Sequence, residues 1–262
     1  MQSGLPGLNG RMAMQKTHAA ITGRASALRK YQEVIVGRFG LGFLLYFEFC
    51  TWLGGIPGAL GIALRGLFWK RLFAHCGPGV LFGTRIILRH PGRIRLDADV
   101  VIGDGCILDG RHEDCCESIV LGRGTMLSND VMLSCKGGAI RVGRHVGINA
   151  RSIVQSVGAC EVRIGDDCVI GQSCLLIGGG SYAIGDTDSG LIRECPMVQD
   201  GGVTLENNVW LGARVTVLGG VRVASGAVAG AGAVLTRSVP PGAVCVGAPA
   251  RVIRTRKAPS ET

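Results

Sequence analysis

Aliphatic residues recur at every sixth position over much of this chain. The longest uninterrupted run of such positions comprises Leu205, Leu211, Val217, Val223, Ala229 and Leu235. A second row of small or β-branched residues follows four positions after each of them, from Val209 to Val239. An α-helix repeats every 3.6 residues and a strand every two, so neither alone gives this period. The pattern indicates a repeat architecture, in which each repeat buries its apolar side chain against the next.

The earlier repeats fall into groups of three. The groups are Leu96, Ile102 and Leu108; Leu121, Leu127 and Leu133; Val142, Ile148 and Val154; and Ile164, Ile170 and Leu176. Between successive groups, and before Leu205, the spacing is 13, 9, 10 and 29 residues instead of six. Each group makes one triangular coil of three strands, and the extra residues all leave from the same corner. The pattern therefore predicts an all-β parallel β-helix over residues 79–254, with a long loop at 178–202.

Residues 41–78 do not follow this period. The 24 residues from Leu41 to Leu64 carry one charge, Glu48, and are interrupted by Gly-Gly-Ile-Pro at 54–57. A stretch of this length can cross a bilayer, but the break favours two short helices. The second helix ends among aromatic and basic residues, a composition suited to a membrane interface. We expect amphipathic helices that cap the open end of the β-helix, contact a membrane through residues 41–74, or do both.

The net charge of +9 is concentrated at the two ends of the chain. Residues 1–78 carry nine Lys and Arg against two Glu, giving +7, and residues 251–262 carry four against one, giving +3. We expect residues 1–40 to be a basic leader, partly disordered or helical, and residues 255–262 to be a C-terminal tail. Nucleic-acid-binding proteins spread basic and aromatic residues over a folded face, so this distribution argues against a nucleic-acid partner. A membrane surface or an acidic polymer fits it better.

The eleven cysteines do not form a metal-binding pattern. Cys115 and Cys116 are adjacent and no CxxC pair occurs, so we expect no metal site. Cys106, Cys168 and Cys174 fall at small inward positions of the repeat, where a free cysteine acts as a buried apolar residue. The first forty residues lack the apolar stretch of a secretory signal, so we expect a cytoplasmic protein with reduced thiols. Contact through residues 41–74 would place it at the inner face of the membrane.

Two late segments carry a family resemblance, VWLGA at 209–213 and VGAPARVI at 246–253. Over residues 96–254 the chain resembles the hexapeptide-repeat acyltransferases, and most closely the exopolysaccharide, galactoside and xenobiotic O-acetyltransferases. The resemblance implies that the parallel β-helix is left-handed and that the chain forms a homotrimer. It also implies transfer of an acetyl group from acetyl-CoA to a hydroxyl of a saccharide, such as a polysaccharide or a lipid-linked glycan precursor, without a metal.

In this family, the loop that corresponds to residues 178–202 carries a catalytic histidine, which takes the proton of the acceptor hydroxyl. Here the loop contains no histidine. Alignment with the xenobiotic type places Tyr182 at that position, and alignment with the exopolysaccharide type places Ala183 there. Asp186 and Asp188 are candidates to orient a base or hold the acceptor, although aspartate is also an ordinary loop residue. Three explanations stay open: a His-to-Ala substitution at 183, a natural homologue without activity, or another base.

The resemblance also implies a donor site in the late coils. In the relatives, the pantetheine arm of acetyl-CoA lies in a groove between neighbouring subunits, and basic residues near the C-terminus hold the nucleotide phosphates. The matching positions of this chain are Trp210, Ala213, Ala231, Thr236, Arg237, Arg251 and Arg254. Arginine suits phosphate binding because its planar fork offers several hydrogen-bond donors. A solvated basic tail is the alternative interpretation of the arginines.

Other classes of protein fit the residues less well. A γ-carbonic anhydrase shares the coil but needs three histidines around a metal, and His112 and His145 do not supply that set. Residues 1–95 lack the Gly-rich phosphate loop that a sugar-nucleotide transferase carries upstream of such a coil. The alternative that remains is a catalytically silent trimer that serves as a binding or scaffold protein, since the expected histidine is missing.

Overall fold

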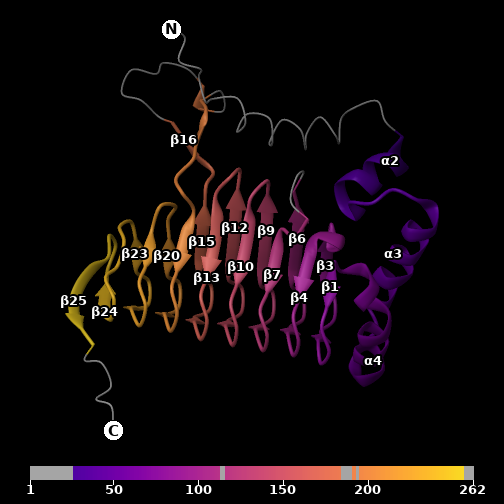
Figure 1. Cartoon of the computed structure of the whole chain (residues 1–262), viewed down its shortest axis with the longest axis horizontal. Coiled ribbons are helices and arrows are strands. Elements are labelled where there is room, and N and C mark those ends of the chain that lie inside the picture. Colours follow the sequence, from indigo (N-terminus) through magenta and orange to yellow (C-terminus); the bar gives the residue numbers. More distant parts are fainter. Residues whose placement is uncertain (1–25, 113–115, 184–190, 193–194, 257–262) are drawn as a thin grey trace.

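The computed structural model of the chain describes residues 26–112, 116–183, 191–192 and 195–256. Within these residues the chain is a parallel β-solenoid with helices at one end (Figure 1). Three sheets, called faces A, B and C here, run along its length and hold seven, nine and seven strands. One coil takes a strand from each face in the order A, B, C, so the corners are A–B, B–C and C–A. The predicted all-β parallel β-helix with a helical N-terminal segment is confirmed.

The strands of each face are short and come from successive coils. Face A consists of β1 (His75–Cys76), β4 (Ile94–Leu96), β7 (Ile119–Leu121), β10 (Ala139–Val142), β13 (Glu161–Ile164), β18 (Val203–Leu205) and β21 (Arg222–Val223). Face B consists of β2 (Leu81–Phe82), β5 (Val101–Ile102), β8 (Met126–Leu127), β11 (Gly147–Ile148), β14 (Val169–Ile170), β19 (Trp210–Leu211), β22 (Val228–Ala229), β24 (Ala243–Val246) and β25 (Arg251–Thr255). Face C consists of β3 (Ile87–Arg89), β6 (Ile107–Arg111), β9 (Met132–Lys136), β12 (Ile153–Val157), β15 (Leu175–Gly178), β20 (Thr216–Val217) and β23 (Val234–Leu235). These strands pair in parallel, except that β25 runs antiparallel to β24.

The six-residue period places one aliphatic side chain of every strand in the core. On face A, for example, Leu96, Leu121 and Val142 are register partners in consecutive coils, and their exposed fractions are 0 to 3%. Each strand forms its backbone hydrogen bonds with the coils above and below it, as parallel strands of a sheet do. The first coil starts at His75, earlier than the expected boundary at residue 79, because Cys76 and Phe82 already occupy inward positions.

The insertions between coils all leave from the C–A corner, as predicted. They connect β6 to β7, β9 to β10, β12 to β13 and β15 to β18, whereas the A–B and B–C corners keep a constant length. Regular strand structure ends at Gly178 on face C and resumes at Val203 on face A. The long loop therefore projects from one edge of an otherwise regular prism.

The helical segment covers the first coil (Figure 1). It comprises α2 (Ala27–Tyr31), the π-helix η1 (Gln32–Val36), α3 (Leu41–Leu53), α4 (Gly58–Phe68) and the 3₁₀-helix η2 (Trp69–Leu72), and a further 3₁₀ turn, η3 (Pro91–Arg93), precedes β4. Leu44, Phe47 and Cys50 of α3 are buried in the same apolar core as the coils. The expected pair of helices and their capping role are thus observed. Among the described helices, none is by itself long and apolar enough to cross a bilayer.

Adjacent residues of β7 offer a matched test of the core. Leu121 is fully buried and Val120 points outward from face A. We expect Leu121→Ala to lower the free energy of unfolding by about 2 to 5 kcal/mol, because it removes buried methyl groups and leaves a cavity. Val120→Ala should cost less than about 1 kcal/mol. Urea unfolding followed by circular dichroism measures both, and equal effects would contradict the inward and outward assignment.

Candidate active site

The loop at the C–A corner begins and ends in a small β-hairpin. Its strands are β16 (Ser181–Tyr182) and β17 (Met197–Val198), which pair antiparallel with Tyr182 opposite Met197. The backbone N–H of Ala183 donates to the carbonyl oxygen of Pro196 at 2.9 Å. Tyr182 and Ala183, the two positions at which the sequence predicts a histidine, therefore lie on a backbone-paired stem. Asp186 and Asp188, the other predicted loop residues, lie outside the described residues.

Asp200 fastens both ends of this hairpin to the solenoid. Its carboxylate accepts hydrogen bonds from the N–H of Gly179 at 3.0 and 2.9 Å and from the N–H of Gly202 at 2.9 Å. Both glycines have positive φ values, +77° and +79°, which L-residues with a side chain rarely adopt. Gly219 also lies so close to the Asp200 carboxylate that a Cβ atom at this position would clash with it. Asp200 was not among the residues predicted from the sequence, although its position between Gln199 and a Gly-Gly pair is a turn signal.

A cysteine also lies under the hairpin. The Sγ of Cys160 lies 3.3 Å from the Oε1 of Gln199, and Cys160 itself is buried. Burial, together with a hydrogen bond to Asp200, raises the pKa of the Cys160 thiol. Burial likewise raises the pKa of Cys106 to about 11. A protonated thiol is a poor nucleophile, so these cysteines act as core residues, as predicted for Cys106.

None of the four histidines in the described part of the chain lies in this loop, so none of them supplies a base there. His90 donates from Nε2 to the carbonyl oxygen of Glu33 at 2.9 Å, and burial lowers its pKa. His145 is exposed and follows β10 at the A–B corner, away from the corner that carries the loop. His112 follows β6 at the C–A corner, three coils before the loop, and His75 opens face A.

The predicted donor residues fall into two groups. Ala213 and Ala231 occupy the same position of the B–C corner in consecutive coils, and the N–H of Gly232 donates to the carbonyl oxygen of Ala213 at 2.8 Å. Trp210 stands beside them on face B with 54% of its surface exposed. The segment that leads to Arg251 is fixed to β23 at this corner by backbone hydrogen bonds of 3.0 and 2.8 Å. The structure thus brings four of the predicted donor residues to one corner of the last coils.

The remaining donor residues lie further from that corner. Thr236 and Arg237 follow β23 and are exposed at the C–A side of the last coil. Arg254 pairs with Val244 in β25, towards the A–B side of face B, and its side chain is exposed. Within a single chain, Thr236, Arg237 and Arg254 therefore do not converge on the corner that holds Ala213 and Ala231.

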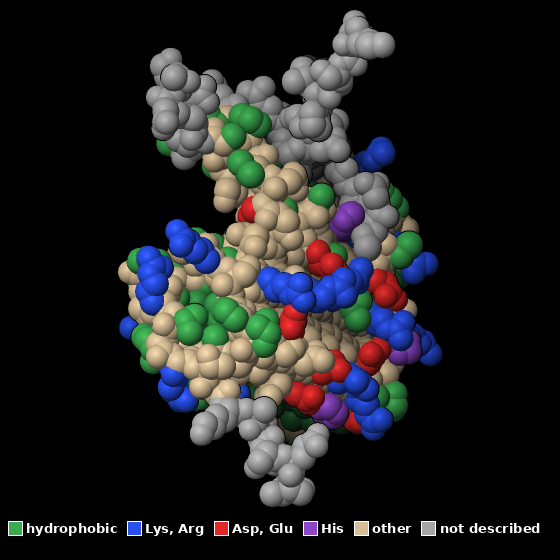
Figure 2. Space-filling model, turned by 60° about the vertical axis from the view of Figure 1, so that its left-hand side comes forward, with side chains coloured by type: hydrophobic (Ala, Val, Ile, Leu, Met, Phe, Trp, Pro, Cys, Tyr) green, Lys and Arg blue, Asp and Glu red, His purple; other side chains and the backbone are tan. Residues whose placement is uncertain are grey.

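The outer surfaces of the three faces differ in chemistry. Over the seven strands from β2 to β22, the outward row of face B is apolar or glycine and comprises Leu81, Val101, Met126, Gly147, Val169, Trp210 and Val228. The outward row of face C is Ile87, Ile107, Met132, Ile153, Leu175, Thr216 and Val234. The outward row of face A is instead mostly charged and carries ion pairs, among them Arg95 with Asp97 at 3.0 Å and Arg163 with Glu161 at 2.8 Å. Face C also carries ion pairs near its helical end, where Asp109 pairs with Arg89 and Arg111. Figure 2 shows the two kinds of surface, interleaved charges on one side and gathered hydrophobic side chains on another.

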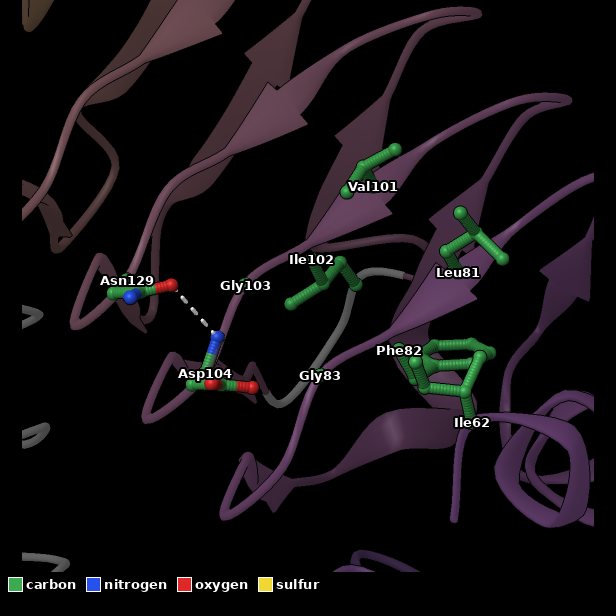
Figure 3. A pocket seen from close by; sticks show the side chains of 9 residues that line it. All are labelled: Ile62, Leu81, Phe82, Gly83, Val101, Ile102, Gly103, Asp104 and Asn129. Carbon is green, nitrogen blue, oxygen red and sulfur yellow. Dashed lines mark hydrogen bonds between the residues drawn. The ribbon is translucent and has the colours of Figure 1, made fainter. Parts of the chain in front are cut away.

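A pocket of about 210 Å³ lies on face B near the helical end, between α4 and the first coils (Figure 3). Ile62, Leu81 and Val101 form its apolar wall. The polar groups at its edge already have hydrogen-bond partners. The Asp104 carboxylate accepts from the N–H of Thr84 at 2.6 Å, and the N–H of Asp104 donates to the side-chain oxygen of Asn129 at 3.1 Å. The pocket is therefore a recess in the apolar surface of face B, separated by several coils from the hairpin and the donor corner.

Comparisons with known proteins agree with this arrangement. Over 52 residues the chain is 44% identical to galactoside O-acetyltransferase of Escherichia coli, a match that covers 20% of this chain and 26% of that protein. It is 50% identical, also over 52 residues, to 2,3,4,5-tetrahydropyridine-2,6-dicarboxylate N-acetyltransferase of Staphylococcus aureus, covering 20% and 22%. The match thus spans about a quarter of these relatives. No family model matches the chain.

Among solved structures, a mutant of AntD, an N-acyltransferase from Bacillus cereus, aligns with a TM-score of 0.50 at 18% identity. The alignment covers 78% of this chain and 92% of that chain. The AntD crystal contains coenzyme A and dTDP-4-amino-4,6-dideoxyglucose. The chain thus shares the β-solenoid fold of that structure. Its homologues are acetyltransferases of the hexapeptide-repeat family, so the resemblance predicted from the late motifs is confirmed.

The role of Asp200 can be tested without knowing the acceptor. We expect Asp200→Ala to speed hydrogen exchange of the Gly179 and Gly202 amides by about tenfold or more, because both N–H groups lose their acceptor. Asp200→Asn keeps one acceptor oxygen and should give a smaller effect. Exchange measured by NMR or mass spectrometry reports both variants. Unchanged protection in Asp200→Ala would show that the hairpin does not depend on this carboxylate.

Proposed function

We propose that this chain is an acetyl-CoA-dependent O-acetyltransferase that acts on a hydroxyl group of a saccharide, such as a polysaccharide or a lipid-linked glycan precursor. The observation that carries the proposal is the corner at which Trp210, Ala213, Ala231 and Arg251 meet. The stacked alanines offer a narrow lining with accessible backbone, which suits the thin pantetheine arm. The homologous galactoside enzyme, by its name, is also an O-acetyltransferase.

The reaction in this proposal is direct transfer. The acceptor oxygen attacks the thioester carbonyl, a new ester bond forms, and the carbon–sulfur bond breaks to release CoA as the thiol. A base takes the proton of the acceptor hydroxyl. Family analogy puts the position of that base on the hairpin at Tyr182 or Ala183, and of these two only Tyr182 has a side chain that can accept a proton, so if Ala183 is the aligned position another group must serve. Asp186 and Asp188 are proposed to orient the base or the acceptor. Thr236, Arg237, Arg251 and Arg254 are proposed to hold the nucleotide phosphates of acetyl-CoA.

The assembly in this proposal is a homotrimer. Faces B and C have apolar outward rows, whereas face A is covered with ion pairs that favour contact with water. A prism in which faces B and C each carry an apolar row and face A is mostly charged suits a ring in which face B of one subunit packs near face C of the next. Such a ring also brings the C–A side of one subunit, which carries Thr236 and Arg237, next to face B of its neighbour, which supports a groove shared between subunits. The proposal includes peripheral membrane contact through residues 41–74, supported by exposed apolar side chains of α3 and α4.

A second candidate function is a catalytically silent binding or scaffold protein. It is favoured by one observation, the absence of a histidine from the loop at 178–202. In this alternative, the donor corner and the trimer are retained and the chain acts through assembly.

Acetyl transfer can be measured directly by mass spectrometry of saccharide acceptors incubated with acetyl-CoA. We expect acceptor-dependent acetylation by the native chain. Tyr182→His or Ala183→His should raise kcat by about 10² to 10⁴, the range that a positioned general base contributes. Only one of the two variants should do so, because only one position faces the thioester.

The binding of acetyl-CoA, measured by calorimetry, distinguishes the outcomes. Arg251→Ala should weaken binding by about tenfold, as loss of a charge-assisted hydrogen bond to phosphate implies, whereas Arg163→Ala on face A should not. Binding without any transfer, in the native chain and in both histidine variants, would support the scaffold. Absence of binding would reject the donor site itself.

The trimer can be tested with two substitutions in the same coil. Met126 points outward from face B and Val120 outward from face A. We expect Met126→Glu to reduce the mass in solution towards that of a monomer, since it places a charge in an apolar interface. Val120→Glu should leave the mass of the trimer unchanged. Light scattering coupled to size-exclusion chromatography measures both, and a monomeric native chain would contradict the proposal.

A further inference from the structure

We propose that the outer face of the helical cap docks on a lipid bilayer that contains anionic headgroups. The outer face of the cap is defined here as Leu41, Leu45 and Trp52 of α3 together with Leu60 and Leu67 of α4. This inference specifies the surface behind the proposed membrane contact. It does not depend on acetyl transfer, so either property can fail while the other is retained.

α3 is apolar on two opposite sides. Leu44 and Phe47 are buried against the solenoid, which accounts for one side. Leu41, Leu45 and Trp52 are exposed by 66, 62 and 70% on the other side. Their spacing of four and seven residues places them on one stripe of the helix. A helix that only capped the solenoid would need one apolar side, so the second apolar side calls for another partner.

α4 extends the same surface. The rings of Phe49 and Phe68 meet edge to face with centroids 5.2 Å apart, and the Tyr46 hydroxyl donates to the carbonyl oxygen of Phe68 at 2.6 Å, which ties the two helices together. Leu60 and Leu67 of α4 are exposed by 67 and 68%. Among the large hydrophobic side chains described outside residues 39–67, none is exposed by more than 59%. The most exposed apolar side chains of the described chain are therefore gathered on the cap.

The cap is held rigidly on the solenoid. Arg65 is completely buried and donates to the carbonyl oxygens of Leu53 at 3.2 Å, Ile56 at 2.7 Å and Phe82 at 3.1 Å. These bonds join the end of α3 and the turn after it to the first coil. The exposed apolar stripe is thus a preformed surface, so docking needs little ordering of the chain.

Charge identifies the partner. The described residues around the cap include the basic Arg29, Lys30, Arg38, Lys70 and Arg71 against the acidic Glu33 and Glu48. Glu48 accepts a hydrogen bond from the Tyr31 hydroxyl at 2.6 Å. Two copies of such a basic surface would repel each other, which disfavours end-to-end pairing. An apolar stripe on a segment with an excess of basic side chains matches the acyl boundary and the anionic headgroups of a bilayer.

The position of the cap fits this role. Figure 1 shows α3 and α4 at one end of the solenoid and β24 and β25 at the other. Docking through the cap leaves faces A, B and C uncovered. The proposed subunit contacts and the hairpin therefore stay accessible while the chain is attached to the membrane.

Co-sedimentation of the full chain with vesicles tests the inference. We expect binding to phosphatidylcholine vesicles that contain phosphatidylglycerol, and weaker binding as salt is raised. The double substitution Leu45→Gln and Trp52→Gln should weaken binding by about tenfold or more, because two apolar side chains no longer enter the bilayer. Both side chains are exposed, so the solenoid should remain folded. Leu218→Gln, at an exposed apolar position of the late coils, is the matched control and should bind as the native chain does.

Three results would overturn the inference. They are absence of vesicle binding by the native chain, equal binding by the double variant, and a lower mass of the double variant in lipid-free solution. The last result would show that the outer face of the cap is a contact between protein chains. Acetylation of a soluble saccharide, measured in parallel, should be the same in the native chain and the double variant.

Discussion

The structure depends on the stacking of successive coils. Each strand finds its backbone partners only in the coils above and below, and each inward aliphatic side chain is covered only by those of its neighbours. A coil by itself is unstable, which makes the period of six residues strict along the faces. The same constraint explains the two ends. The helical cap covers the first coil, and β25 pairs with β24 at the other end of face B, so the first coil and the last edge of face B are protected.

The features behind the proposed function lie at the corners between the faces. The C–A corner tolerates extra residues, and it carries the hairpin fastened by Asp200. The B–C corner keeps its length, and this regularity is what stacks Ala213 on Ala231 beside Trp210. Faces B and C each carry an apolar outward row, whereas the outward row of face A is mostly charged. One repeat thus provides a loop at one corner, a regular corner with stacked alanines, and faces of different chemistry.

The solenoid, its coil boundaries after residue 96 and the corner of the insertions were predictable from sequence, because one inward residue in six is enough to fix the register. The first coil was not, since Cys76 is an untypical member of the aliphatic row. Asp200 was also missed, because its role comes from contacts with Gly179 and Gly202 that depend on the path of the loop. The donor residues were suggested by motifs, but only the fold shows that Ala213, Ala231 and Arg251 share a corner. That α3 is apolar on two opposite sides could be recognised only from the exposed fraction of each of its side chains.

The central claim is that the late coils bind acetyl-CoA in a groove next to the hairpin. The most direct measurement is an experimental structure of the full chain with CoA bound. The account predicts a trimer with the pantetheine arm along Ala213 and Ala231, the phosphates near Arg251, and the sulfur facing the hairpin of a neighbouring subunit. CoA bound away from the B–C corner, or a chain that remains monomeric with CoA bound, would contradict it.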